Sequence, residues 1–142
     1  MASLSFPDVN VWLALLLENH TSRASARNWW ESDDSDRILF ARFTQVSVLR
    51  LLMTAAAMND NPLTMKQAWQ AYDHLFEDDR VALASEPDTL EAEFRKQSAS
   101  ATASPKVWAD AYLLAFSAAA GATLVTFDRA LGSRSASCLV LE

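Results

Sequence analysis

Short, almost wholly apolar segments recur along this chain and alternate with longer segments of helical periodicity. A strand that lacks polar residues on either side must be covered on both faces, as in parallel sheets. Alternation of strands and helices favours parallel pairing, because a crossover helix returns the chain to the same edge of the sheet. The sequence therefore predicts an α/β protein, a three-layer α/β/α sandwich with a central, mostly parallel sheet. The expected strands are Leu4–Phe6, Ile38–Phe43, Val81–Leu83, Leu124–Phe127 and Cys138–Leu141, the last at an edge.

Capping residues and prolines mark where the helices begin. Threonine side chains accept hydrogen bonds from the free N–H groups of a first turn, and proline is tolerated there. Gly121 follows the longest apolar helix and is typical of a left-handed C-terminal cap. The expected helices run from Val9 or Asn10 to Glu18, from Thr21 to Glu31, from Thr44 to Met58, from Met65 to Phe76, from Pro87 to Lys96 and from Lys106 to Ala120.

Length and composition narrow the class of protein. The 142 residues suit one domain, expected to span residues 1–142. The 51% of hydrophobic residues excludes a disordered chain. A single cysteine, Cys138, excludes an internal disulfide framework and is typical of a reducing cytoplasm. The net charge of -6 excludes nucleic-acid binding through bulk charge, so such a role needs a local basic patch, a metal ion or a partner.

Neither apolar run of the sequence indicates export or a membrane span. Val11–Leu17 has no basic residue before it and no evident cleavage site. The uncharged run Ala111–Phe127 has the minimum length of a span, but a buried helix, a glycine cap and a strand explain it better. We expect a cytoplasmic protein without membrane contact.

Three aspartates from distant parts of the sequence are expected to meet. Asp8 follows the first strand, Asp128 follows the Leu124–Phe127 strand, and Asp110 lies in the second turn of an otherwise uncharged helix. Ligands of open α/β sheets bind beyond the carboxyl ends of the strands. Carboxylate oxygens there suit Mg²⁺ or Mn²⁺.

Each aspartate also has a purely structural interpretation. Asp8 can cap a helix, and Asp128 can be a turn residue. Asp110 can form an ion pair with an arginine such as Arg50 or Arg129. The joint pattern of the three is more specific than any one of them.

Other catalytic and binding motifs are missing from the sequence. His20 and His74 have no zinc-site spacing, and there is no glycine-rich phosphate loop or Gly-x-Ser-x-Gly nucleophile. Trp12, Trp69 and Trp108 fall on apolar helical faces and are expected in the core.

Four segments together resemble a PIN domain of the VapC toxin type, in order and over nearly the whole chain. They are Phe6-Pro7-Asp8-Val9-Asn10-Val11-Trp12-Leu13-Ala14, then Phe43-Thr44-Gln45 leading into Leu49-Arg50-Leu51-Leu52, then Trp108-Ala109-Asp110-Ala111-Tyr112-Leu113, and Leu124-Val125-Thr126-Phe127-Asp128.

The resemblance implies a metal-dependent ribonuclease, the toxin of a VapBC-type toxin–antitoxin pair inhibited by a VapB-type antitoxin protein. It implies that Asp8 and Asp110 hold Mg²⁺ (or Mn²⁺) and that Asp128 completes the catalytic acids. Asn10 and Thr126 match supporting positions. An RNA substrate and a homodimer are the other partners expected on this basis.

Gln45 departs from the family pattern, which commonly has an acidic residue at this position. A neutral amide weakens the case for a second metal ion. The alternative function is therefore a non-catalytic PIN-like module that binds RNA or protein through a scaffold with a weakened metal site. A metal-dependent phosphatase on a similar sheet is a third possibility.

Overall fold

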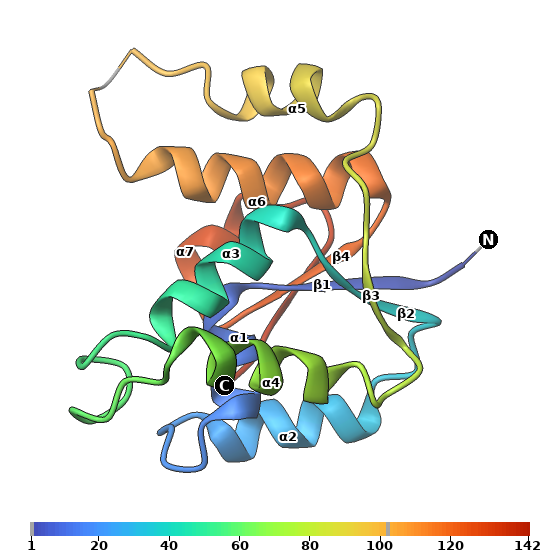
Figure 1. The fold of residues 1–142 in the computed structure, drawn as a ribbon. Helices are drawn as coiled ribbons and strands as arrows, with labels where there is room; N and C mark the ends of the chain where they lie inside the picture. The colour runs from blue at the N-terminus through green and yellow to red at the C-terminus, as the bar shows by residue number, and fades with distance from the viewer. Residues whose placement is uncertain (1, 102) are drawn as a thin grey trace.

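A computed structural model describes residues 2–101 and 103–142 of the chain. Its strands form one parallel sheet in the order β3-β2-β1-β4-β5, with β1 at the centre and β5 at an edge (Figure 1). The parallel α/β architecture predicted from the sequence is confirmed. The strands are β1 (Leu4–Pro7), β2 (Arg37–Phe40), β3 (Val81–Leu83), β4 (Thr123–Thr126) and β5 (Cys138–Val140).

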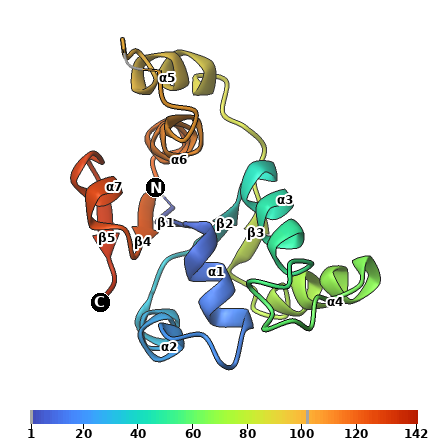
Figure 2. The same ribbon diagram turned by 90° about the vertical axis from the view of Figure 1, so that its left-hand side faces the viewer.

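Helices cover both faces of the sheet and complete three layers (Figures 1 and 2). One buried cluster joins the sheet to α1–α4, and a second joins its other face to α5–α7. The helices are α1 (Val9–Leu16), α2 (Arg23–Ser32), α3 (Arg42–Leu51), α4 (Met65–Leu75), α5 (Leu90–Gln97), α6 (Val107–Ala120) and α7 (Arg129–Ser133).

Successive side chains of the inner strands enter opposite clusters. In β2, Ile38 and Phe40 pack with α1–α4, whereas Leu39 packs with α5–α7. In β4, Leu124 and Val125 divide in the same way. Two covered faces require apolar residues at consecutive positions, which is why these strands show no polar alternation in the sequence.

The tryptophans divide between core and surface. Trp12 is fully buried and stacks on Phe40 with ring centroids 4.0 Å apart, as the sequence predicts for a core residue. The same prediction is wrong for Trp69 and Trp108, which are 48% and 58% exposed. Both lie at the rim of an apolar helical face and only their ring edges meet a neighbour, Tyr72 and Phe94 respectively.

The predicted boundary between the second strand and the third helix is wrong. β2 ends at Phe40, and α3 begins at Arg42 rather than after Thr44. The Thr44 hydroxyl accepts from the Ala41 amide at 3.0 Å and donates to the Ala41 carbonyl at 2.9 Å, so it supports the first turn from within. The apolar run at residues 38–43 hides this change, because a short apolar run fits strand and helix equally.

The third helix is also shorter than predicted. It ends at Leu51 instead of Met58, and the chain then forms turns in which Asn59 and Asp60 have φ of 49° and 66°. Just after the helix, the Thr54 hydroxyl donates to the Leu51 carbonyl at 2.8 Å and accepts from the Ala57 amide at 3.3 Å, so it satisfies backbone groups in a turn instead of a helix.

The short helix α7 was not expected, although the sheet edge after it was. Its N-terminal cap is Asp128, whose carboxylate accepts from the Leu131 amide at 3.0 Å. Both edge strands, β3 and β5, contain only three residues. Within the described residues, no helix has the length and apolarity to cross a membrane.

Gly132 is the point at which α7 rests on β5. A Cβ atom at this position would lie 2.5 Å from Cγ2 of Val140 and 3.1 Å from Sγ of Cys138. We expect Gly132→Ala to lower the free energy of unfolding by about 1–3 kcal/mol through overpacking, measured by urea denaturation. Ala130→Ser on the exposed side of the same helix is the control, and equal stability of the two variants would contradict this packing.

Candidate active site

Asp8 stands where the central strand ends and α1 begins. Its backbone amide donates to the Val125 carbonyl of β4 at 2.8 Å, which holds residue 8 against the neighbouring strand. One carboxylate oxygen, Oδ1, accepts from the Val9 amide at 2.7 Å, so Asp8 caps α1. The capping role predicted as the structural alternative is therefore present. It leaves the carboxylate half-buried at the carboxyl edge of the sheet.

Asp128 reaches the same edge from β4. In the sheet, β2 and β3 lie on one side of β1, and β4 and β5 lie on the other. The ends of β1 and β4 therefore flank the point where the strand order reverses, which is where parallel sheets open a crevice. Asp128 is exposed there, and its Oδ1 caps α7.

Thr126 connects these two segments. Its hydroxyl donates to Oδ2 of Asp8 at 2.9 Å and accepts from the Asp128 amide at 3.0 Å. The side chain is fully buried. A hydroxyl that donates and accepts at once fixes the Asp8 carboxylate relative to the Asp128 backbone.

Asp110 comes from α6, in the first turn of the helix. Burial raises the pKa of its carboxyl, the charge of Asp128 raises it further, and Arg134 lowers it. The predicted ion pair with Arg129 is not found, since Arg129 pairs with Glu142 at 3.1 Å. The positive charge that acts on Asp110 comes instead from Arg134, the C-terminal cap residue of α7. The sequence does not predict this helix, so it does not predict this neighbour either.

The three carboxylates repel one another electrostatically. The pKa of Asp8 is raised first by burial, against the hydrogen bonds from Thr126 and Val9, and then by the charges of Asp110 and Asp128. The structure thus brings the three predicted acids into one electrostatic cluster. They do not form a closed cage: across residues 2–101 and 103–142, no three Asp, Glu, His or Cys side chains lie close enough to hold a metal ion together.

The remaining predicted residues differ in their surroundings. Asn10 is exposed on the second residue of α1. Gln45 is buried, and its amide oxygen accepts from the Arg42 guanidinium at 2.6 Å. Its side chain also hydrogen-bonds the Tyr72 hydroxyl. Gln45 therefore ties α3 to α4, and its role at the acidic cluster stays a prediction.

Three carboxylates at a crevice, two of them with a raised pKa (Asp8 and Asp110), and one nearby arginine are suited to bind a hard divalent cation. Buried acids without a cation nearby are stabilised by taking up a proton or by pairing with a basic side chain. Here three carboxylates share one nearby cation, Arg134, so the cluster keeps an excess of negative charge. Its chemistry therefore fits hydrolysis assisted by a metal ion.

Comparisons with known proteins agree with this fold. The model of the PIN domain family matches residues 5–135. The chain is 43% identical over 128 residues to a protein of Mycobacterium tuberculosis named Ribonuclease VapC41, covering 87% of this chain and 88% of that protein. The same protein from a second strain of that species matches equally.

Two crystal structures share the fold. VapC20 of Mycobacterium tuberculosis, described as a toxin that cleaves the sarcin–ricin loop, has a TM-score of 0.67 at 17% identity and covers 92% of this chain and 94% of its own. VapBC2 of Rickettsia felis, bound to a DNA fragment from its promoter, has a TM-score of 0.59 at 10% identity, with coverages of 98% and 99%.

Removal of one acid should stabilise the protein at neutral pH. The folded state raises the pKa of Asp110, so the native protein binds protons more tightly than the unfolded chain and its free energy of unfolding falls as pH rises through that range. We expect Asp110→Asn to unfold at a higher urea concentration than the parent protein at pH 7.5. The difference in stability between the two proteins should disappear below the ordinary aspartate pKa. A variant that is less stable at pH 7.5 would contradict the repulsion.

The Thr126 hydroxyl can be removed without changing the shape of the side chain. Thr126→Val should raise the pKa of Asp8 further, because a hydrogen bond to its ionised form is lost. The Asp128 amide also loses the acceptor of a partly buried hydrogen bond, at a cost of about 1 kcal/mol in the free energy of unfolding. Carboxyl NMR titration and urea denaturation measure the two effects. An unchanged Asp8 titration would show that the hydroxyl does not hold this carboxylate.

Proposed function

The chain belongs to the PIN-domain family, and we propose that it is a ribonuclease of the VapC type, the toxin of a toxin–antitoxin pair, dependent on Mg²⁺ or Mn²⁺. The observation that carries this proposal is the convergence of Asp8, Asp110 and Asp128 at the crevice between β1 and β4. The relative named Ribonuclease VapC41, matched over most of both chains, supports the reaction class.

The donor set fits a hard cation. Each oxygen of the Asp8 carboxylate accepts one hydrogen bond, from Val9 or Thr126, and keeps a further lone pair. Asp128 uses only one oxygen to cap α7. Mg²⁺ binds with one or two carboxylates, several waters and substrate phosphate, so the open arrangement of the acids suits it. We assign Asp8 and Asp110 as the metal-binding residues, with Asp128 completing the acidic set.

The chain's own residues position and polarise the site. When bound, the ion supplies positive charge against the growing charge of the phosphoryl oxygens and lowers the pKa of the attacking water. Thr126 fixes the Asp8 carboxylate through the hydrogen bond from its hydroxyl, and the exposed Asp128 carboxylate would orient the attacking water. Because the pKa values of Asp8 and Asp110 are raised, the acids lose their protons, and become able to bind the ion, only as pH rises through this raised range.

We assign a VapB-type antitoxin as the inhibitory partner and a homodimer as the assembled state. The similarity to VapBC2 of Rickettsia felis supports the antitoxin. Co-purification with the product of a small neighbouring reading frame, followed by light scattering, tests both parts. A monomer that binds no such product would contradict them.

Cleavage of single-stranded RNA tests the enzymatic proposal. We expect cleavage with Mg²⁺ or Mn²⁺ and none in excess chelator. Asp110→Asn should lower the rate by roughly 10²–10³, as expected when one charge-stabilising group of an active site is lost. Asp79→Asn, an exposed acid in the turn before β3, is the matched control and should retain full activity.

Thermal unfolding with added Mg²⁺ separates the enzyme from the non-catalytic alternative. A ligand that binds only the native state raises the melting temperature, so the parent protein should be stabilised and Asp110→Asn should not. Absence of a shift in the parent protein, together with absence of cleavage, would favour the binding module with a decayed site.

A further inference from the structure

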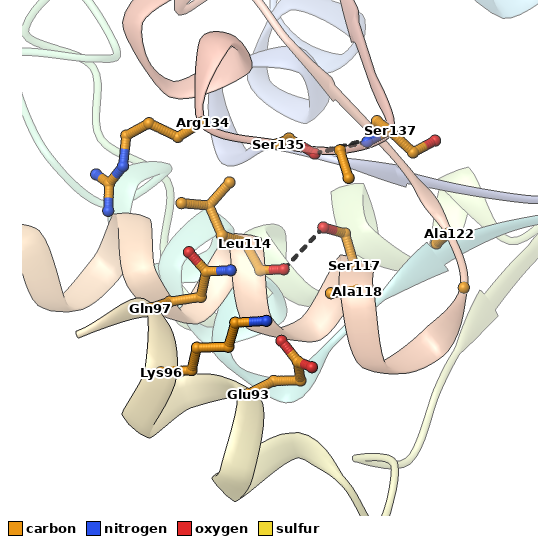
Figure 3. A pocket seen from close by; sticks show the side chains of 12 residues that line it. Glu93, Lys96, Gln97, Leu114, Ser117, Ala118, Ala122, Arg134, Ser135 and Ser137 are labelled. Carbon is orange, nitrogen blue, oxygen red and sulfur yellow. Dashed lines mark hydrogen bonds between the residues drawn. The ribbon is translucent and has the colours of Figure 1, made fainter. Parts of the chain in front are cut away.

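A cleft with polar and apolar lining residues runs along α6 (Figure 3). It has a volume of about 420 Å³ and lies over α6 between α5 and the segment that joins α7 to β5. Figure 3 shows Lys96 and Gln97 reaching in from α5, with Arg134 and Ser135 on the opposite wall. The volume is within the range of small-ligand sites.

Two cations line this cleft without forming a salt bridge. In the part of the chain that the structure describes, neither the Lys96 nor the Arg134 side chain makes a salt bridge or a hydrogen bond, although Arg134 acts electrostatically on Asp110. Their neighbours differ: Arg95 pairs with Glu91 at 3.3 Å, and Arg129 pairs with Glu142. The chain thus leaves positive charge unpaired at this cleft while its net charge is -6.

The cleft begins next to the acidic cluster. Leu114, one helical turn after Asp110 on α6, lies on its floor. Arg134, on its wall, acts electrostatically on Asp110. An RNA strand whose scissile phosphate lies at the acids would therefore bring a neighbouring phosphate to Arg134 and the next part of its backbone over α6.

We propose that this cleft binds the RNA backbone beside the cleavage site, with Arg134 and Lys96 contacting phosphates that flank the scissile one. The inference rests on the proposed ribonuclease function and adds the path of the substrate. Proteins that bind single strands combine such a charged groove with contacts along the backbone. An acidic protein segment would also meet these cations, but it would not explain why Arg134 acts on Asp110 as well.

Binding of a labelled single-stranded oligoribonucleotide in chelator tests the path independently of cleavage. Lys96→Ala and Arg134→Gln should each weaken binding by about tenfold, as for the loss of one charge-assisted contact. Each substitution should also reduce the slope of log K, where K is the binding constant, against log salt concentration by about 0.7. This is the value for one phosphate contact on a single strand. Arg95→Ala and Arg129→Ala, the ion-paired neighbours, are the controls and should bind like the parent protein.

A charge change of the opposite sign sharpens the test. Glu93, on α5, is the acidic residue that lines the cleft, and Glu93→Gln should strengthen binding. With Mg²⁺ present, Lys96→Ala should raise KM with little change in kcat, because Lys96 lies farther from the reacting phosphate than Arg134.

Two results would overturn the proposal: no binding of RNA by the parent protein, or equal binding by the variants and the controls. Variants that bind RNA normally but lose affinity for the antitoxin would assign the cleft to that partner instead. If the variants lose RNA binding and the parent protein does not cleave, the proposed function fails and the RNA path stands.

Discussion

Burial of carboxylates, together with their mutual repulsion, is the constraint on which the candidate site of this molecule depends. A parallel sheet with β1 at its centre places the residues that follow β1 and β4 side by side, so Asp8 and Asp128 meet wherever this strand order forms. Folding supplies the energy to hold them there, and the raised pKa values of Asp8 and Asp110 show the cost. The acidic cluster thus lowers local stability, and perturbed pKa values of this kind are common at functional sites.

The strand-ending acids were predictable because the sequence encodes their neighbours directly. An apolar strand followed by aspartate and a helix leaves few places for Asp8 or Asp128 except the carboxyl edge of the sheet. Gly121 likewise marks the end of α6, with φ of 66°. Arg134 was not predictable, because it follows a five-residue helix that has too few turns to show a period, and its relation to Asp110 exists only in three dimensions. The exposure of Trp69 and Trp108 escaped prediction for a similar reason: a helical face shows which side is apolar but not how far its neighbours extend.

Gln45 stands where the family commonly has an acidic residue, and here it has structural hydrogen-bond partners. Its amide oxygen accepts from Arg42 on the same helix, and its side chain hydrogen-bonds Tyr72 on α4. A buried amide needs such partners, because leaving its polar atoms unpaired would destabilise the fold. A carboxylate at residue 45 would meet the same arginine but would bring a charge into a site that is 4% exposed. The neutral side chain therefore suits the packing of α3 on α4, whatever it contributes to the acidic cluster.

The brevity of β3 and β5 has a consequence for how copies of this protein meet. Further strands pair with a sheet through the unpaired N–H and C=O groups of its edge strands. An edge strand of three residues has few such groups. At the β5 border, α7 also presses Gly132 against Val140, which adds bulk beside the outermost row. Edge-to-edge pairing of sheets from different copies of the protein is thus disfavoured at both edges. The helical layers, by contrast, carry exposed apolar side chains such as Val46, Met65 and Trp69.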